Sequence, residues 1–115
     1  MVWRSALEET RGRLASYRRN TIGVMVDWSE RGEHIFAKHG ITVVEANEAL
    51  ADPNQVVIDP DYNSKNGEGI RIIGFSTSAN AVITVIAYIK GGAWTGASAW
   101  KSNSRDNRYY LQGGQ

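Results

Sequence analysis

The stretch from Ile70 to Lys101 constrains the fold most strongly, because it contains three segments with high β propensity. Ile70–Ser76 and Ala81–Ile89 are dense in β-branched and aromatic residues, which fit a pleated, half-buried surface. The link between them is rich in Ser and contains Asn, which favour turns. A Gly-Gly pair then leads into Trp94–Lys101. The sequence therefore predicts three consecutive antiparallel strands, a meander.

The residues before this meander indicate a strand followed by a helix. Ile22–Val26 is a short apolar run that predicts a strand. Asp27 or Ser29 is expected to cap a helix that runs to about His39, since the spacing here is that of a capping box. Gly40 fits the left-handed position that commonly ends a helix.

A second helix is predicted directly afterwards. Thr42 and Glu45 have the spacing of a capping box, and the apolar Ile41 precedes them. Apolar residues at helical spacing continue as far as Leu50. Pro53 ends the helix, because the residue before a proline is disfavoured in the α conformation.

The remaining elements complete an α+β pattern. A short strand is predicted at Gln55–Ile58 and a polar, glycine-containing loop at Asp59–Gly69. Asn103 or Ser104 is expected to cap a last helix, Arg105–Leu111. We therefore predict an α+β fold: an antiparallel β-meander of about four to five strands with two N-terminal helices and one C-terminal helix, the helices lying on one face of the sheet.

The chain of 115 residues has the length of one domain. We expect a single domain over residues 25–111, preceded by an Arg-rich extension, residues 1–24, that could form a loosely packed helix. The start lacks the apolar stretch of a secretory signal, and the longest apolar run, Ala81–Ile89, is too short to span a bilayer. There is no cysteine, and we expect a cytoplasmic protein.

Charge is unevenly distributed along the chain, although the net charge is only +1. Residues 1–24 hold five Arg and two Glu, and residues 25–68 hold nine acidic and three basic residues. Residues 69–115 hold five basic residues and one Asp. A basic end can attract phosphates, and an acidic face can dock a basic partner. The alternative is a solvated surface of mixed charge.

Common metal-binding and catalytic patterns are missing from the sequence. His34 and His39 would lie about 140° apart on a helix, so they cannot share a metal. Neither the phosphate-binding pattern G-x-x-x-x-G-K-[ST] nor the nucleophile pattern G-x-S-x-G occurs. Asp59 and Asp61 lie in the polar loop, where paired carboxylates are usually solvated.

Cations and aromatic residues gather near the C-terminal end. Lys101 closes the last predicted strand, and Arg105, Arg108, Tyr109 and Tyr110 follow on the final helix. RNA binding uses charge for phosphates and rings for unstacked bases. Metal-free cleavage of a phosphodiester uses cations together with a base and an acid. The alternative is a polar helix whose tyrosines pack on the sheet.

Three groups of short motifs occur in order along the chain. They are Asp27-Trp28 with Lys38-His39-Gly40-Ile41, then Glu45-Ala46 with Ala51-Asp52-Pro53, then Arg71 and Gly74 with Ser98-Ala99, Asp106 and Tyr110. Taken together they resemble the BrnT family of toxins from type II toxin–antitoxin modules, over about residues 25–110.

The resemblance implies a RelE-like α+β fold and a metal-independent ribonuclease toxin that needs no cofactor and is either ribosome-independent or ribosome-linked. It also implies a small antitoxin partner with a ribbon-helix-helix DNA-binding part, and repression by the pair of its own promoter. A homo-oligomer is compatible with this setting. A different class of function stays open: a catalytically degenerate member that only binds RNA or the antitoxin.

The resemblance and the basic C-terminal end together give a candidate site. The expected catalytic residues are Arg71, Lys101, Arg108, Asp106, Tyr110 and His39. The expected substrate-binding residues are Lys38, Trp100, Arg105 and Tyr109. One departure from the family is Trp100, which stands where the family has Arg. The nearest cation in the sequence is Lys101, and neighbouring residues of a strand point to opposite faces, so Lys101 should point away from the face of Trp100. Three alternatives follow: a neighbouring cation (Lys101, Arg105 or Arg108) compensates for the missing Arg, Trp100 stacks a base instead, or cleavage is weakened or lost.

Three of these residues have alternative structural roles. His39 could interact with the negative end of its helix, and Asp106 could cap the first turn of the final helix. Arg71 must be paired if it is buried. We expect Arg71 at the end of the sheet instead, where it would grip phosphate.

Overall fold

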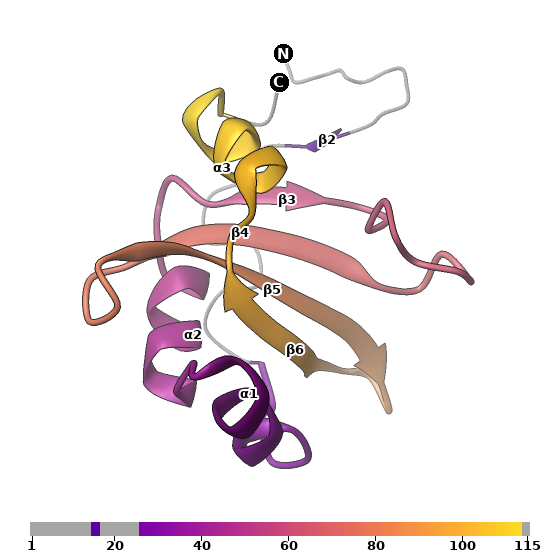
Figure 1. Cartoon of the computed structure of the whole chain (residues 1–115). Helices are drawn as coiled ribbons and strands as arrows, with labels where there is room; N and C mark the ends of the chain where they lie inside the picture. Colours follow the sequence, from indigo (N-terminus) through magenta and orange to yellow (C-terminus); the bar gives the residue numbers. More distant parts are fainter. Residues whose placement is uncertain (1–14, 17–25, 114–115) are drawn as a thin grey trace.

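The computed structural model of the chain describes residues 15–16 and 26–113, which are built around an antiparallel sheet (Figure 1). The order of its strands is β2-β3-β4-β5-β6, and all the neighbours pair antiparallel. The strands are β2 Ala15–Ser16, β3 Val56–Ile58, β4 Ile70–Ser76, β5 Ala81–Lys90 and β6 Ala93–Lys101. The predicted meander is confirmed, because β4, β5 and β6 are neighbours both in the chain and in the sheet.

The N-terminal predictions fall mostly outside the described residues. Only Ala15–Ser16 of the predicted extension is described, and these residues form a strand paired with β3, so the predicted helix is wrong at this position. Of the strand predicted over Ile22–Val26, only Val26 is described, and it belongs to no strand. The next residue, Asp27, forms an isolated parallel bridge with Thr95 of β6.

Helix α1 spans Gly32–His39, so it begins later than the sequence predicted. The Oδ1 atom of Asp27 accepts a hydrogen bond from the backbone N–H of Ser29 at 2.8 Å, which closes a turn ahead of the helix. Arg31 occupies the N-cap, and its side chain makes no capping hydrogen bond. The predicted C-terminal end is confirmed, since Gly40 follows the helix with a φ of 71°.

Helix α2 spans Val43–Leu50 and begins at the predicted capping box. The backbone N–H of Glu45 donates to the Oγ1 atom of Thr42 at 3.1 Å, and the backbone N–H of Thr42 donates to the Oε1 atom of Glu45 at 2.9 Å. Helix α2 thus starts from a local signal that is independent of the rest of the fold.

Helices α1 and α2 cover one face of the sheet, where the main core lies. The buried side chains of this core include Ile35, Ala46, Leu50, Ile72, Ile83 and Val85. Helix α2 packs closely against β4 at Gly74, where a Cβ atom would lie only 2.1 Å from the carbonyl oxygen of Ala49. The glycine is therefore required by close packing of the two backbones.

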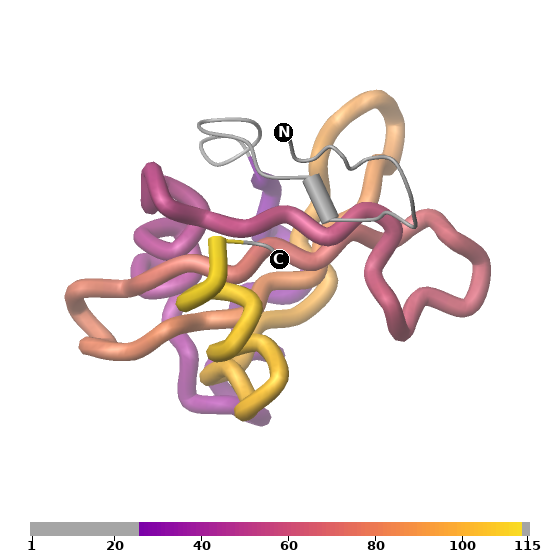
Figure 2. Tube along the Cα trace, turned by 90° about the horizontal axis from the view of Figure 1, so that it is seen from above, coloured from indigo at the N-terminus to yellow at the C-terminus, as the bar shows by residue number. Residues whose placement is uncertain are grey.

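Helix α3, Ser104–Leu111, packs on the opposite face of the sheet, so the prediction that all helices share one face is wrong. In Figure 2, α3 (yellow) crosses in front of the sheet and α1 and α2 (purple to magenta) lie behind it. The reason is that β4 is buried on both faces: Ile72 faces the main core, whereas Ile73 packs with Val56 in a second cluster. Both faces of such a strand need a cover.

The start of α3 follows the sequence prediction. The Oδ1 atom of Asn103 accepts a hydrogen bond from the backbone N–H of Asp106 at 2.9 Å. The described residues thus form an α+β fold with three helices and an antiparallel sheet, as predicted. None of the helices in the described part of the chain is long and apolar enough to cross a bilayer.

Candidate functional site

The side chain of Arg71 is the centre of a buried polar cluster on the α3 face of the sheet. Arg71 belongs to β4 and is only 2% exposed. Its Nε atom donates to the Oδ1 atom of Asp61, and its Nη1 atom donates to the Oδ2 atom of Asp106, both at 2.6 Å. The expectation that Arg71 lies open at the end of the sheet is therefore wrong, and the alternative, a buried and paired arginine, holds.

The electrostatic environment of Arg71 keeps its guanidinium charged. Burial lowers the pKa of Arg71, but the hydrogen bonds and charges of Asp61 and Asp106 outweigh this effect, so the pKa is raised overall. Both carboxyl groups bind the same guanidinium. Arg71 consequently has few donors left for a phosphate in this arrangement.

The Asp106 carboxylate is completely buried and joins several elements. Besides Arg71, it accepts hydrogen bonds from the hydroxyl of Tyr62 at 2.6 Å and from the Oγ1 atom of Thr84 at 2.8 Å. Burial of Tyr62 and its hydrogen bond to Asp106 raise the pKa of this phenol to about 12. The 59–69 loop, β4, β5 and α3 thus meet at one carboxylate.

Planar groups are arranged around Arg71 in a series that we call the cation–aromatic column. The guanidinium carbons of Arg71 and Arg105 lie 4.0 and 3.9 Å from the ring centroid of Tyr62. The guanidinium carbon of Arg71 also lies 5.6 Å from the ring centroid of Trp100. The rings of Trp100 and His39 are 5.7 Å apart. The column therefore runs from the end of α1, past the edge strand β6, to α3.

The outer surface of α3 adds further basic and aromatic groups to one end of the column. Arg105, Arg108, Tyr109 and Gln112 line a shallow depression of about 230 Å³. Arg105 and Arg108 are exposed, and the rings of Tyr109 and Tyr62 have centroids 6.2 Å apart. Five predicted site residues, apart from the buried Arg71 and Asp106, thus lie on the column or on this surface: His39, Trp100, Arg105, Arg108 and Tyr109.

Other predicted site residues lie apart from the column. Lys101 pairs with Ile83 while Trp100 pairs with Thr84, so Lys101 is on the α1 and α2 side of the sheet, as its place in the strand predicted. It is exposed there, as is Lys38 on α1.

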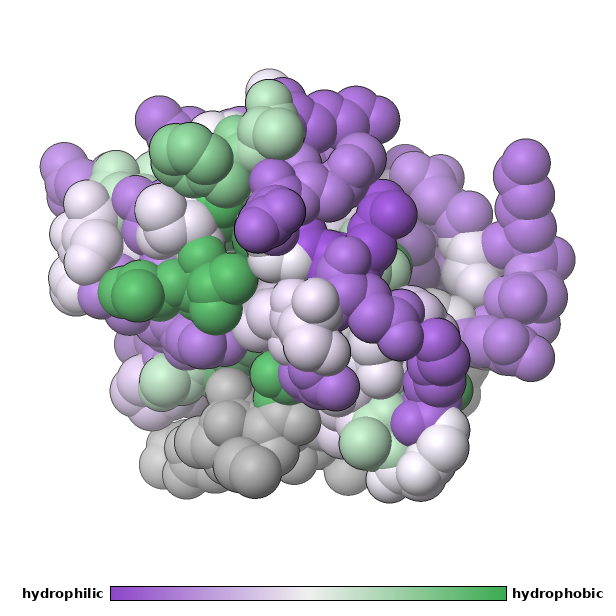
Figure 3. All heavy atoms as spheres, turned by 90° about the horizontal axis from the view of Figure 1, so that it is seen from below, coloured by the Kyte–Doolittle hydropathy of each residue, from purple (hydrophilic) through white to green (hydrophobic). Residues whose placement is uncertain are grey.

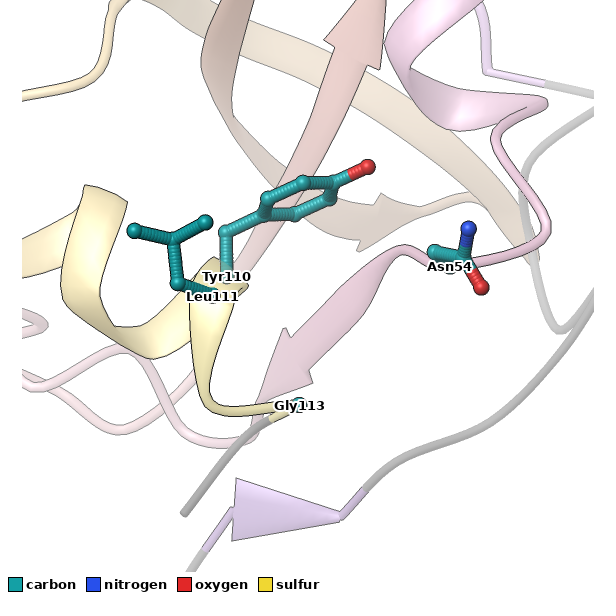
Figure 4. A pocket seen from close by; sticks show the side chains of 4 residues that line it. All are labelled: Asn54, Tyr110, Leu111 and Gly113. Atoms are coloured by element: carbon teal, nitrogen blue, oxygen red, sulfur yellow. The ribbon is translucent and has the colours of Figure 1, made fainter.

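Tyr110 is directed away from the column. Its hydroxyl donates to the Oδ2 atom of Asp52 at 2.6 Å, which joins α3 to the segment after α2. Figure 4 shows its ring extending from α3 toward Asn54, on the opposite side from Leu111. The contacts of Tyr110 are those of a packing residue.

The sequence interpretation missed three members of the cluster: Asp61, Tyr62 and Thr84. The expectation that Asp61 is solvated is wrong, because its side chain is only 7% exposed and is bound to Arg71. One signal was available: an arginine inside an otherwise apolar strand needs carboxylate partners. The pattern does not say which carboxylates of the chain supply them.

Among the described residues, no group of three or more His, Asp or Glu side chains is arranged to hold a metal ion. Comparison of the chain with protein-family models and with curated proteins finds no match.

Proposed function

We propose that this chain binds RNA through the half-buried Trp100 and the exposed Arg105 of the cation–aromatic column, together with the adjoining surface of α3. The observation that carries the proposal is the column itself, in which Trp100 and Tyr62 flank a guanidinium fixed by two carboxylates. Aromatic rings and guanidinium planes stack on unstacked bases. The exposed Arg105 and Arg108 supply charge for phosphates beside them.

The proposal includes the setting that the resemblance to BrnT-like toxins implies. The chain would be the toxin of a type II toxin–antitoxin module in the cytoplasm, and its protein partner a ribbon-helix-helix antitoxin. Expression should then arrest growth, and co-expression of the product of the adjacent short reading frame should relieve the arrest. Expression without arrest would contradict this setting, while RNA binding would still be testable with purified protein.

Metal-independent RNA cleavage is the second candidate function, and the position of His39 favours it. A base stacked on Trp100 would bring its ribose near an imidazole that can move a proton. Arg71 and Asp106 are bound to each other below the surface, so they would position the neighbouring rings without touching RNA. In this proposal Arg71 and Asp106 are positioning residues, and not the catalytic residues expected from the sequence.

RNA binding is tested by the fluorescence anisotropy of a labelled single-stranded RNA. Trp100→Ala should weaken binding by about tenfold, since one stacked base contributes about 1–3 kcal/mol. The double variant Arg105→Ala/Arg108→Ala should weaken binding. It should also make the plot of log binding constant against log salt concentration less steep, by about 0.7 for each phosphate that is no longer neutralised.

The matched control for charge removal is Lys101→Ala, because Lys101 is an exposed cation on the other face of the sheet. It should change the affinity by less than about twofold. An equal loss of binding free energy per charge removed, in the control and in the double variant, would indicate attraction by net charge alone and would count against the proposed surface.

Cleavage is tested separately by incubating the purified protein with total RNA in the presence of a chelator. If His39 moves a proton, His39→Ala should stop cleavage while the anisotropy still shows binding. Absence of cleavage by the unaltered protein would remove the second candidate and leave the binding function.

A further inference from the structure

A groove of about 470 Å³ lies between the turn that precedes α1, helix α1 and the first turn of α2. It is formed on the α1 and α2 side of the sheet and is therefore separate from the Arg71 cluster and α3. Figure 3 views the molecule from below, the side on which α1 lies, and shows apolar (green) side chains gathered beside hydrophilic (purple) ones.

The groove has an apolar floor and an apolar edge. Trp28 is buried at its base and is held there by a hydrogen bond of 3.0 Å from its Nε1 atom to the Oδ1 atom of Asn47. Phe36 of α1 lines the groove and is 59% exposed, and Val44, next to the lining residue Val43, is 62% exposed. Large apolar side chains that stay exposed beside a groove indicate a site for a partner.

The charged residues that line the groove, Glu30 and Glu33, are both acidic. The nearby cation Arg31 is turned away, because its Nε atom donates to the carbonyl oxygen of Ala97 in β6 at 3.1 Å. The rim already binds one ammonium group, since Lys90 of the β5–β6 hairpin lies 2.8 Å from Glu30. Glu33 remains available for a second cation.

We propose that this groove docks a basic, amphipathic peptide segment of a partner protein. An apolar side chain of the segment would sit on Trp28 beside Phe36, and a flanking Arg or Lys side chain would pair with Glu33. The volume of the groove lies within the range of pockets that enclose a small ligand, so it has room for one or two large side chains. This inference does not depend on RNA binding, which uses other residues.

The test uses the full chain and two labelled peptides of about 12 residues, a length that can form a short helix. One peptide has leucines at helical spacing among Lys and Arg, and the other has Glu in place of each cation. The first should bind and the second should not. Phe36→Ala should weaken binding of the first peptide by at least about tenfold, as is typical of a central apolar contact. Glu33→Lys should weaken it severalfold, with a smaller effect at high salt.

Two variants provide matched controls. Ile89→Ala removes an apolar side chain that is 52% exposed on β5, and Glu68→Lys inverts an exposed charge in the 59–69 loop; neither should alter binding of the first peptide. Equal binding of the two peptides, or an unchanged affinity in Phe36→Ala, would overturn the proposal. A dimer of the chain that Phe36→Ala dissociates would also overturn it, because the occupant would then be a second copy.

Discussion

The Nη1 atom of Arg71 lies 2.6 Å from the Oδ2 atom of Asp106, and this ion pair connects β4 to the first turn of α3. Both side chains are almost completely buried. A buried ion pair adds little net stability compared with a well-packed apolar pair, but breaking it leaves an uncompensated charge. The pair is therefore one of the contacts that hold α3 on the sheet, and the two residues should be much more sensitive to replacement than exposed charges are.

Asp106→Ala should destabilise the protein by about 3–5 kcal/mol, because it leaves the buried guanidinium of Arg71 with a single carboxylate partner. Urea denaturation followed by circular dichroism gives the free energy of unfolding. Asp59→Ala, which removes an exposed carboxylate, should change it by less than about 0.5 kcal/mol. A loss below about 1 kcal/mol for Asp106→Ala would show that the pair is not needed to hold α3.

The elements that the sequence predicted correctly depend on local signals. Thr42 and Glu45 form their capping box within four residues, and Gly40 ends α1 through its own backbone conformation. The strands of the meander follow from residue types that suit a sheet. Such signals need no knowledge of distant contacts, so they can be read from the sequence.

The cluster around Arg71 depends on distant contacts and could not be predicted in the same way. Its partners Asp61 and Asp106 are 10 and 35 residues away in the chain. The sequence also does not predict on which face of the sheet α3 packs. The reason is that β4 is buried on both faces and shows no alternation of polar and apolar residues. Candidate site residues could be chosen by type, but their burial could not.

Gly74→Ala should destabilise the protein by about 1–3 kcal/mol or more, because the added methyl group would lie 2.1 Å from the carbonyl oxygen of Ala49. The backbones of α2 and β4 would have to separate. Thermal unfolding should show a lower midpoint. Gly69→Ala is the matched control, since the nearest atom to its new Cβ would be 3.7 Å away, and it should have a much smaller effect.

Glu48→Gln should reduce stability in a pH-dependent way. The hydrogen bonds that Ser78 and Ser76 donate to Glu48 lower its pKa below the ordinary value of 4.5. The ionised carboxylate thus contributes stability above pH 4.5, and this contribution is lost as the pH falls below that value. The difference in unfolding free energy between the protein and the variant should accordingly shrink on acidification. A difference that stays constant from about pH 7 to about pH 3 would contradict this assignment.

The variant Tyr62→Phe removes the hydroxyl of Tyr62 but keeps its ring, so it distinguishes the contributions of the two groups. The hydroxyl donates to Asp106 at 2.6 Å, so its removal should cost about 1.5–3 kcal/mol, the range for a hydrogen bond to a charged group. The ring stays available to the guanidinium groups of Arg71 and Arg105, so RNA binding through the column should change by less than about threefold.

The pH dependence of the same phenol provides a second measurement. The folded pKa of Tyr62, about 12, lies above the ordinary value of 10.0, so its protonated form contributes stability that is complete below pH 10 and is lost as the pH rises toward 12. In an ultraviolet titration of the folded protein, the amplitude of ionisation near pH 12 should be smaller by one phenol in Tyr62→Phe than in the unaltered protein. If the amplitude near pH 12 is the same in the variant, Tyr62 does not ionise late and the Tyr62–Asp106 hydrogen bond does not hold in solution.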